Sequence, residues 1–313
     1  MILTFTPNPA VDKTVFIDAL TPGEKIRSQR CTCIPGGKGS NVSRAVKALG
    51  GDTAAMMIVG GRPGQHVVDM IEQQDGVRCV PVWVQGMTRT ITTVLEEPIH
   101  RQTAFFEPGP QLTETEMESL LAVFTEVVVE ARVVTFNGAV PDPGLRGVYE
   151  RMIAVAKEAG VLTLLDSYGP EFAQGLEAVP CMIKPNLAEA EAALGRALDS
   201  ESARWRAIDA FHQRGIALVV LSLGSEGALA SRDGERLRVI PPEIEEINAV
   251  GSGDALVAGF ALGLHEGWSL EAMARLGVAA GTANAMSWDI GHFTREEVDA
   301  VAARVRVERV QGM

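Results

Sequence analysis

Short apolar runs alternate along most of the chain with longer segments whose apolar residues recur every three to four positions. The short runs have the length of strands buried on both faces, and the longer segments have the periodicity of helices. We therefore expect an α/β fold with a mostly parallel sheet covered by helices on both faces. The expected strands are 2–5, 53–59, 133–136, 161–165, 182–183 and 218–221, and the expected helices are 40–49, 64–74, 113–125, 144–159, 187–194, 201–214, 254–266, 270–286 and 294–304.

Two regions, residues 12–34 and 78–106, break this rhythm. Apolar and polar residues alternate there, with no helical segment between them. A period of two is typical of antiparallel strands that have one face on the protein and one in water. We expect a small separate sheet inserted into a single domain that spans residues 1–313. Its spare face is expected to cover the site as a lid or to join two subunits in a homodimer.

Composition and charge narrow the class of protein. Of the 313 residues, 46% are hydrophobic, which suffices for a large core, and the formal net charge is −12. This negative charge argues against broad binding to nucleic acid or to an anionic membrane. The four cysteines show neither zinc-ligand spacing nor a disulfide framework. No charged leader or membrane-length apolar run is visible, so we expect a cytoplasmic enzyme.

The segment 248–254, just before an expected helix, is the first candidate for chemistry. Its two glycines, Gly251 and Gly253, allow a tight turn with exposed amides, and amides at a helix N-terminus bind anions. Asp254 repels a bound phosphate there unless it accepts the proton of an attacking alcohol. The alternative is an ordinary helix start with an acidic first turn, and this segment alone does not separate the two.

A second glycine-rich segment, residues 35–41, also precedes a helix. Gly37 and Gly39 let the backbone approach a ligand closely, while Lys38 and Asn41 offer side-chain donors. Taken alone, such a segment is more often a simple turn than a binding site.

Other candidates follow expected strands, at the sheet edge where α/β proteins bind ligands. Asp12 and Asn137 are in such positions, although Asp12 alone is more usually a turn residue. Residues 222–227 end another strand with two glycines, which leaves room for a nucleotide or forms a hairpin turn. Asn186 and Glu189 lie three apart at a helix start. That spacing suits Mg²⁺ bound through waters, but it favours a capping box.

Together these segments resemble the pfkB family of ribokinase-like carbohydrate kinases. The resemblance rests on residues 36–41, 184–189, 222–227 and 248–254, in the family's order, and it spans essentially the whole chain. It implies a ribokinase-like three-layer α/β/α core with a small β-sheet lid. Residues 6–12, with Thr88-Arg89 and residues 107–110, resemble the branch of the family that phosphorylates hexose phosphates.

The resemblance also implies a role for each candidate residue, with ATP and Mg²⁺ as cofactors. A potassium ion beside the main-chain oxygens of 248–250 and 282–288 is a further implication. The implied catalytic residues are the base Asp254 and an anion hole formed by the amides of Gly251, Ser252, Gly253 and Asp254; the sugar-phosphate residues are Asp12, Gly37, Lys38, Gly39, Asn41, Arg89 and Asn137; the nucleotide residues are Lys184, Asn186, Ser222, Gly224, Gly227 and Asn284; and Asn186 with Glu189 lies near the metal.

The chain departs from the family pattern at three places in the expected substrate half of the site. They are Phe105-Phe106, residues 137–141 and residues 166–169. We expect ATP-dependent phosphorylation of D-fructose 1-phosphate to fructose 1,6-bisphosphate. The nearest alternative is a tagatose-6-phosphate kinase, or a 6-phosphofructokinase of the same family. A catalytically silent sugar-phosphate sensor is a remote alternative, because a sensor needs neither Asp254 nor the anion hole.

Overall fold

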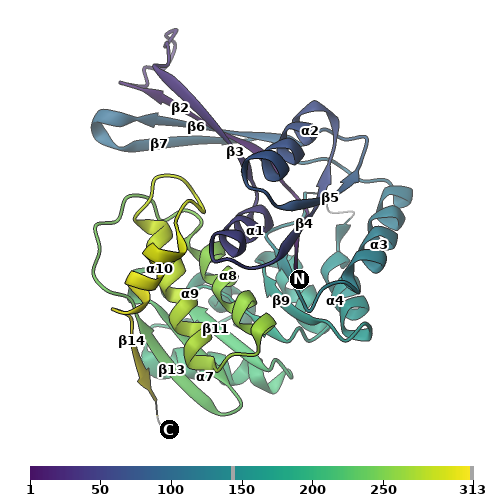
Figure 1. The fold of residues 1–313 in the computed structure, drawn as a ribbon, viewed down its shortest axis with the longest axis vertical. Coiled ribbons are helices and arrows are strands. Elements are labelled where there is room, and N and C mark those ends of the chain that lie inside the picture. The colour runs from purple at the N-terminus through teal and green to yellow at the C-terminus, as the bar shows by residue number, and fades with distance from the viewer. Residues whose placement is uncertain (142–144, 311–313) are drawn as a thin grey trace.

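The computed structural model describes residues 1–141 and 145–310, and its centre is a large sheet (Figure 1). Within these residues the sheet has ten strands, and it is parallel except at one end, where the last three strands run antiparallel. In spatial order the strands are β14 (Arg306–Arg309), β13 (Glu235–Ile240), β12 (Ala228–Arg232), β11 (Leu218–Ser222), β10 (Met182–Ile183), β9 (Leu162–Asp166), β8 (Val133–Asn137), β1 (Ile2–Thr6), β4 (Thr53–Val59) and β5 (Arg78–Trp83).

Helices cover both faces of this sheet, and its central strands are therefore buried on both sides. Every residue of β1 is buried; Ile2 packs into one helical layer, and Leu3 and Phe5 pack into the other. The layer with Leu3 and Phe5 holds α3 (Glu114–Val128), α4 (Val148–Glu158), α5 (Gly169–Glu177), α6 (Leu187–Leu194) and α7 (Glu201–Gln213), and the other face holds α1 (Lys38–Ala48), α2 (Gly61–Asp69), α8 (Ser252–Glu266), α9 (Leu270–Ala285) and α10 (Arg295–Ala302).

The expected three-layer α/β/α architecture is confirmed, with local differences. The expected helix 64–74 is α2 followed by a π-helical turn at Met70–Gln74. The expected helix 144–159 is α4, which begins at Val148, and residue 144 lies outside the described residues. The sequence pattern does not predict α5 or the antiparallel strands β12 to β14. No described helix is both long and apolar enough to span a membrane.

A second sheet projects from the body of the molecule (Figure 1). Its strands are, in order, β3 (Arg30–Gly36), β2 (Ala10–Ile17), β6 (Arg89–Glu96) and β7 (Arg101–Phe106), with a short 3₁₀ turn at Glu97–Ile99. We call it the small sheet. It differs from the expectation in its members, because residues 78–83 form β5 at the edge of the large sheet. The region 78–106 therefore contributes only β6 and β7.

The small sheet also differs in pairing, because β2 and β6 are parallel rather than antiparallel. Both strands begin beyond the carboxyl ends of the parallel strands of the large sheet: β2 follows β1 directly, and β6 follows β5. Since β1 and β5 belong to the parallel part of the large sheet, the strands that continue from them run in the same direction. The outer strands β3 and β7 return antiparallel to them.

Candidate active site

Two cavities meet at the start of α8 and share Gly253. The first has a volume of about 470 Å³ and lies between the ends of β1 and β8 and the inner face of the small sheet. We call it the small-sheet cavity. The second, the helix-side cavity, has a volume of about 530 Å³ and lies between the β11–β12 turn, residues 241–246 and helices α8 and α9. The predicted residues that line the first are Asp12, Gly37, Lys38, Asn41, Arg89, Asn137, Gly251, Gly253 and Asp254, and those that line the second are Asn186, Ser222, Gly224, Gly227, Ser252 and Gly253.

Helix α8 begins without a side-chain cap, unlike α3, α6, α7, α9 and α10, which begin with one. Its N-cap is Gly251 in a left-handed conformation with φ 83°. A side chain at Gly251 would overlap Ile290, so glycine is required there. The amides of Gly253 and Asp254, like the first amides of any helix, have no acceptor within the helix. Amides left free at a helix N-terminus can bind an anion, and these two lie where the two cavities meet.

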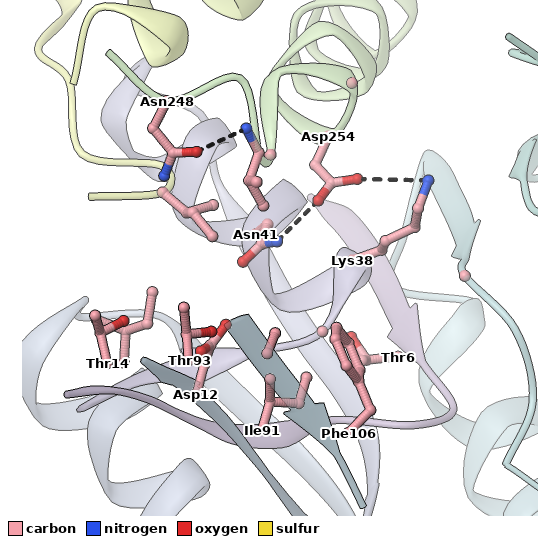
Figure 2. A pocket seen from close by; sticks show the side chains of 18 of the residues that line it. Thr6, Asp12, Thr14, Lys38, Asn41, Ile91, Thr93, Phe106, Asn248 and Asp254 are labelled. Carbon is pink, nitrogen blue, oxygen red and sulfur yellow. Dashed lines mark hydrogen bonds and ion pairs between the residues drawn. The ribbon is translucent and has the colours of Figure 1, made fainter. Parts of the chain in front are cut away.

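Asp254 lies in the first turn of α8 and faces the small-sheet cavity (Figure 2). Its side chain is almost fully buried, and its Oδ2 accepts a hydrogen bond of 2.8 Å from Asn41 Nδ2. Lys38 Nζ is 3.9 Å from Oδ1. Burial raises the pKa of Asp254 to about 6, although Lys38 opposes the rise. The carboxylate can therefore accept a proton near neutral pH.

A second buried carboxylate, Asp166, holds two lysines beside Asp254. It ends β9, is fully buried, and lies 3.1 Å from both Lys38 Nζ and Lys184 Nζ. Burial by itself raises the pKa of Asp166, but Lys184 and Lys38 outweigh it and hold this pKa below its usual range. Sequence reasoning placed residues 166–169 in the substrate half of the site but gave Asp166 no role, although its place at the end of a buried strand was an available signal.

The inner face of the small sheet contributes a carboxyl group and a guanidinium group to the cavity. Asp12 lies on β2, where burial raises the pKa of its carboxyl group against the opposing charge of Arg89. Arg89 begins β6 and donates from one terminal nitrogen to the main-chain oxygen of Asn8 at 3.1 Å. Its Nε is buried and has no partner in the described residues. The guanidinium lies 6.0 Å from the ring centre of Phe106, which also lines the cavity.

The glycines that start α1 have different roles. Gly37 has φ 112° and lines the small-sheet cavity. Gly39 is buried, and a side chain there would overlap Thr6 and the main chain of Phe5. It allows α1 to pack on β1 and does not line the cavity.

Asn137 ends β8 and lines the small-sheet cavity. Its Nδ2 donates to Thr135 Oγ1 at 2.7 Å. Its Oδ1 is buried and has no hydrogen-bond partner among the described residues, so it can accept a bond from a ligand.

Asn186 and Glu189 form the capping box that their spacing favours. Asn186 Oδ1 accepts from the Glu189 amide at 2.9 Å, and Glu189 Oε2 accepts from the Asn186 amide at 2.8 Å. Asn186 lines the helix-side cavity, with Ser222 of the adjacent strand. In the part of the chain that the structure describes, no three acidic, histidine or cysteine side chains gather in a way that would hold a metal ion. The side-chain oxygens of Asn186 and Glu189 therefore suit a hydrated metal ion that arrives with a nucleotide better than an ion bound by protein ligands alone.

The β11–β12 turn leaves backbone room in the helix-side cavity. Gly224 and Gly227 have φ values of 60° and 92°, and a side chain at Gly227 would overlap Val239 O. Asn284, expected on the nucleotide side, has another position. It is buried, donates to Val250 O at 2.8 Å, and accepts from the Gly291 amide at 2.8 Å. Its amide thus ties the turn before α8 to the segment after α9.

The segment after α9 closes one end of the small-sheet cavity. Sequence reasoning considered residues 282–288 only for main-chain oxygens near a potassium ion and missed their part in this wall. Trp288 and Asp289 line the cavity, and the Trp288 ring centre lies 6.3 Å from that of Phe16 on β2. Trp288 O accepts a hydrogen bond of 3.0 Å from Asn248 Nδ2. The contact joins residues far apart in the chain, so no local pattern signals it.

The model of the pfkB family carbohydrate kinases matches residues 6–287. The chain belongs to this family. One relative is a tagatose-6-phosphate kinase from Staphylococcus epidermidis. It is 32% identical to this chain over 319 residues, which cover 99% of this chain and 100% of that protein. The resemblance noted in the sequence is thereby confirmed.

Solved structures of similar kinases share the whole fold. Phosphofructokinase-2 from Escherichia coli, solved in complex with fructose-6-phosphate, has a TM-score of 0.88 and 29% identity, covering 97% of this chain and 98% of that one. The same protein has been solved with potassium and in a tetrameric inhibited form. A possible 1-phosphofructokinase from Thermotoga maritima has a TM-score of 0.88 and 25% identity, covering 99% of each chain.

Proposed function

We propose that this pfkB-family kinase transfers the γ-phosphoryl group of ATP to the primary hydroxyl of a hexose phosphate. The proposed acceptor is D-fructose 1-phosphate, and the product is fructose 1,6-bisphosphate. The junction of the two cavities is the observation that carries the proposal. Asp254 faces one cavity, Ser252 lines the other, and Gly253 lines both. An acceptor and a nucleotide in these cavities meet at free helix amides beside a buried carboxylate.

Each group at this junction has a part in the transfer. Asp254 takes the proton of the acceptor hydroxyl, whose oxygen then bonds to the γ-phosphorus while ADP leaves. The amides of Gly253 and Asp254 bind the phosphoryl oxygens, where charge develops. Lys38 and Lys184, held by Asp166, add positive charge nearby. Asn186 and Glu189 lie where they would help to hold a hydrated Mg²⁺ ion that arrives with the nucleotide, and such an ion would neutralise further phosphate charge.

The acceptor is held from the small-sheet side. Arg89 binds its phosphate, since a guanidinium with a free Nε can form charge-assisted hydrogen bonds with phosphate oxygens. Asp12 and Asn41 bind sugar hydroxyls and direct one of them toward Asp254. The small sheet acts as a lid, which keeps out water that would otherwise compete for the phosphoryl group.

A potassium ion beside the main-chain oxygens of 248–250 and 282–288 stays a prediction. Two of these oxygens, those of Val250 and Trp288, already accept hydrogen bonds from asparagine side chains. The family resemblance implies the ion, and the potassium complex of the E. coli relative supports the idea. The potassium dependence of the activity is measured by replacing sodium chloride with potassium chloride at constant ionic strength.

Tagatose 6-phosphate is the second candidate acceptor, because a similar kinase is named for it. The residues that depart from the family pattern bear on this choice. Phe106, Ala139 and Tyr168 all line the small-sheet cavity, where the acceptor would lie. A silent sensor is less favoured, since binding alone requires neither a carboxylate at Asp254 nor free amides beside it.

The test is ADP release by the purified protein with a panel of hexose and pentose phosphates. The highest kcat/KM is expected with D-fructose 1-phosphate. A higher value with tagatose 6-phosphate or fructose 6-phosphate would replace the proposed acceptor within the same chemistry. Binding of a sugar phosphate without ADP release would favour the sensor.

We also propose a homodimer joined through residues within 12–34 and 78–106. Phe105 and Phe106 are 57% and 66% exposed on β7, an edge strand of the small sheet. Exposed apolar side chains on an edge strand favour pairing with another chain. Light scattering at micromolar concentration should give twice the monomer mass, and Phe105→Asp should lower it. A monomer, or a dimer insensitive to changes in both segments, would contradict this placement.

A further inference from the structure

Three threonines form a row across the inner face of the small sheet. Thr14 on β2 is the register partner of Thr32 on β3 and of Thr93 on β6. All three line the small-sheet cavity. Figure 2 shows Thr14 and Thr93 beside Asp12, across the cavity from Asp254. We call these three residues the threonine row.

The hydroxyl groups of the threonine row are free to bind a ligand. Within residues 1–141 and 145–310, no hydrogen bond joins any of the three hydroxyls to another protein group. Each hydroxyl offers one donor and two acceptor sites. Neighbouring strands are about 4.8 Å apart, so successive hydroxyls of the row are close enough for more than one of them to bond to the same sugar.

The two ends of the small-sheet cavity carry side chains of opposite charge. Arg89 lies four residues before Thr93 on β6 and on the same face, which separates them by about 13 Å. At the other end the cavity is lined by Asp289, next to Trp288, which packs on Phe16 just beyond Thr14. A carboxylate repels a phosphate, whereas neutral hydroxyls bind sugar hydroxyls without an electrostatic cost. An acceptor in this cavity would therefore lie with its phosphate at Arg89 and its free hydroxyls toward the row.

We propose that the threonine row is a subsite for the non-phosphorylated hydroxyls of the acceptor and that it selects among epimeric sugar phosphates. The inference rests on the proposed function and adds to it a specificity determinant outside the predicted site residues. Ketohexose phosphates such as those of fructose and tagatose differ in the orientation of one hydroxyl. A fixed row of hydroxyls bonds well to one orientation and leaves the other unpaired.

Thr14→Val and Thr93→Val test the row, because valine keeps the shape of threonine and removes only the hydroxyl. The matched control is Thr92→Val, next to Thr93 on β6 but on the opposite face of the sheet. For each variant, KM and kcat/KM are measured for ATP, fructose 1-phosphate, fructose 6-phosphate and tagatose 6-phosphate. Calorimetric titration with each sugar phosphate in the absence of ATP measures binding independently of turnover.

The row variants should raise KM and Kd for the preferred sugar phosphate by about 3- to 10-fold each, the effect of one lost hydrogen bond. The ratio of kcat/KM between the epimers should shift by at least about threefold, while KM for ATP stays within about twofold. Thr93→Ser should restore both values.

Two results would overturn the inference. If the row variants bind and discriminate sugar phosphates as Thr92→Val does, the row takes no part in acceptor binding. If they raise KM for ATP as much as KM for the sugar phosphate, they disturb the fold of the site instead. Wild-type protein that binds a sugar phosphate but releases no ADP would refute the proposed kinase activity while the titrations still decide the row. Wild-type protein that binds no sugar phosphate would refute both.

Discussion

The two cavities that meet at Gly253 differ in the residues that line them. The small-sheet cavity is lined by charged side chains from distant segments, among them Asp12, Lys38 and Arg89. The helix-side cavity is lined mostly by glycines, small polar residues and apolar side chains such as Leu256 and Val278, and its only charged lining residues among those described are Glu243 and Glu246. A cavity of charged side chains binds through a few strong contacts, whereas one of backbone and apolar surface spreads the binding over many weak ones. Single substitutions should therefore have large effects on the first side and small effects on the second.

The largest effect should come from Asp254, where the two cavities meet. Asp254→Asn keeps the size of the side chain and removes the proton acceptor, so kcat should fall by roughly 10²–10⁴-fold with little change in ATP affinity. Steady-state kinetics with a separate measurement of ATP binding checks both expectations. Near-normal turnover would remove Asp254 from the mechanism.

Arg89→Ala should have the next largest effect, and on one substrate only. Loss of a charge-assisted contact of about 1.5–3 kcal/mol corresponds to a rise of about 10- to 150-fold in KM for the sugar phosphate. KM for ATP should change little. Arg78→Ala, at a surface ion pair with Glu130 on the edge of the large sheet, is the matched control. A rise confined to KM for ATP would mean that Arg89 acts on the nucleotide and not on the sugar phosphate.

The pH profile tests the buried environment of Asp254. Because burial raises its pKa to about 6, the carboxyl group is protonated and inactive below that pH. The value of kcat should then fall about tenfold for each pH unit below 6. An acidic limb near pH 4, where an ordinary aspartate titrates at about 3.9, would contradict the effect of burial. Acid stability is followed in parallel by circular dichroism, so that unfolding is not mistaken for titration.

The smallest effect is expected at Ser222, on the helix-side cavity. Its hydroxyl forms a weak hydrogen bond of 3.4 Å with Pro185 O, and the cavity around it is mostly backbone and apolar. Ser222→Ala should therefore raise KM for ATP by less than about fivefold, with the acceptor KM unchanged. An increase above about tenfold would mean that a single side chain dominates nucleotide binding, and the contrast between the cavities would fail.

Much of the small-sheet cavity was accessible from sequence, but its pairing was not. Asp254 and Asn41 were candidates because of their glycine-rich surroundings, and the resemblance to the pfkB kinases implied their roles. The structure joins them by a hydrogen bond of 2.8 Å across 213 positions of the chain. The parallel pairing of β2 with β6, which aligns Thr14 with Thr93, was expected to be antiparallel. Local alternation shows which residues share a face of a strand, but not which strand lies next to it.

By itself, the sequence determined the alternation of strands and helices, the glycine-marked helix starts and the likeness to the pfkB kinases, because these depend on residues close together in the chain. Only the tertiary structure decided that Asp166 holds Lys38 and Lys184, that Trp288 meets Phe16, and that three threonines align across one sheet face. Each of these contacts joins segments brought together by packing around the whole core. Their geometry follows from strand order and burial, which no local pattern contains.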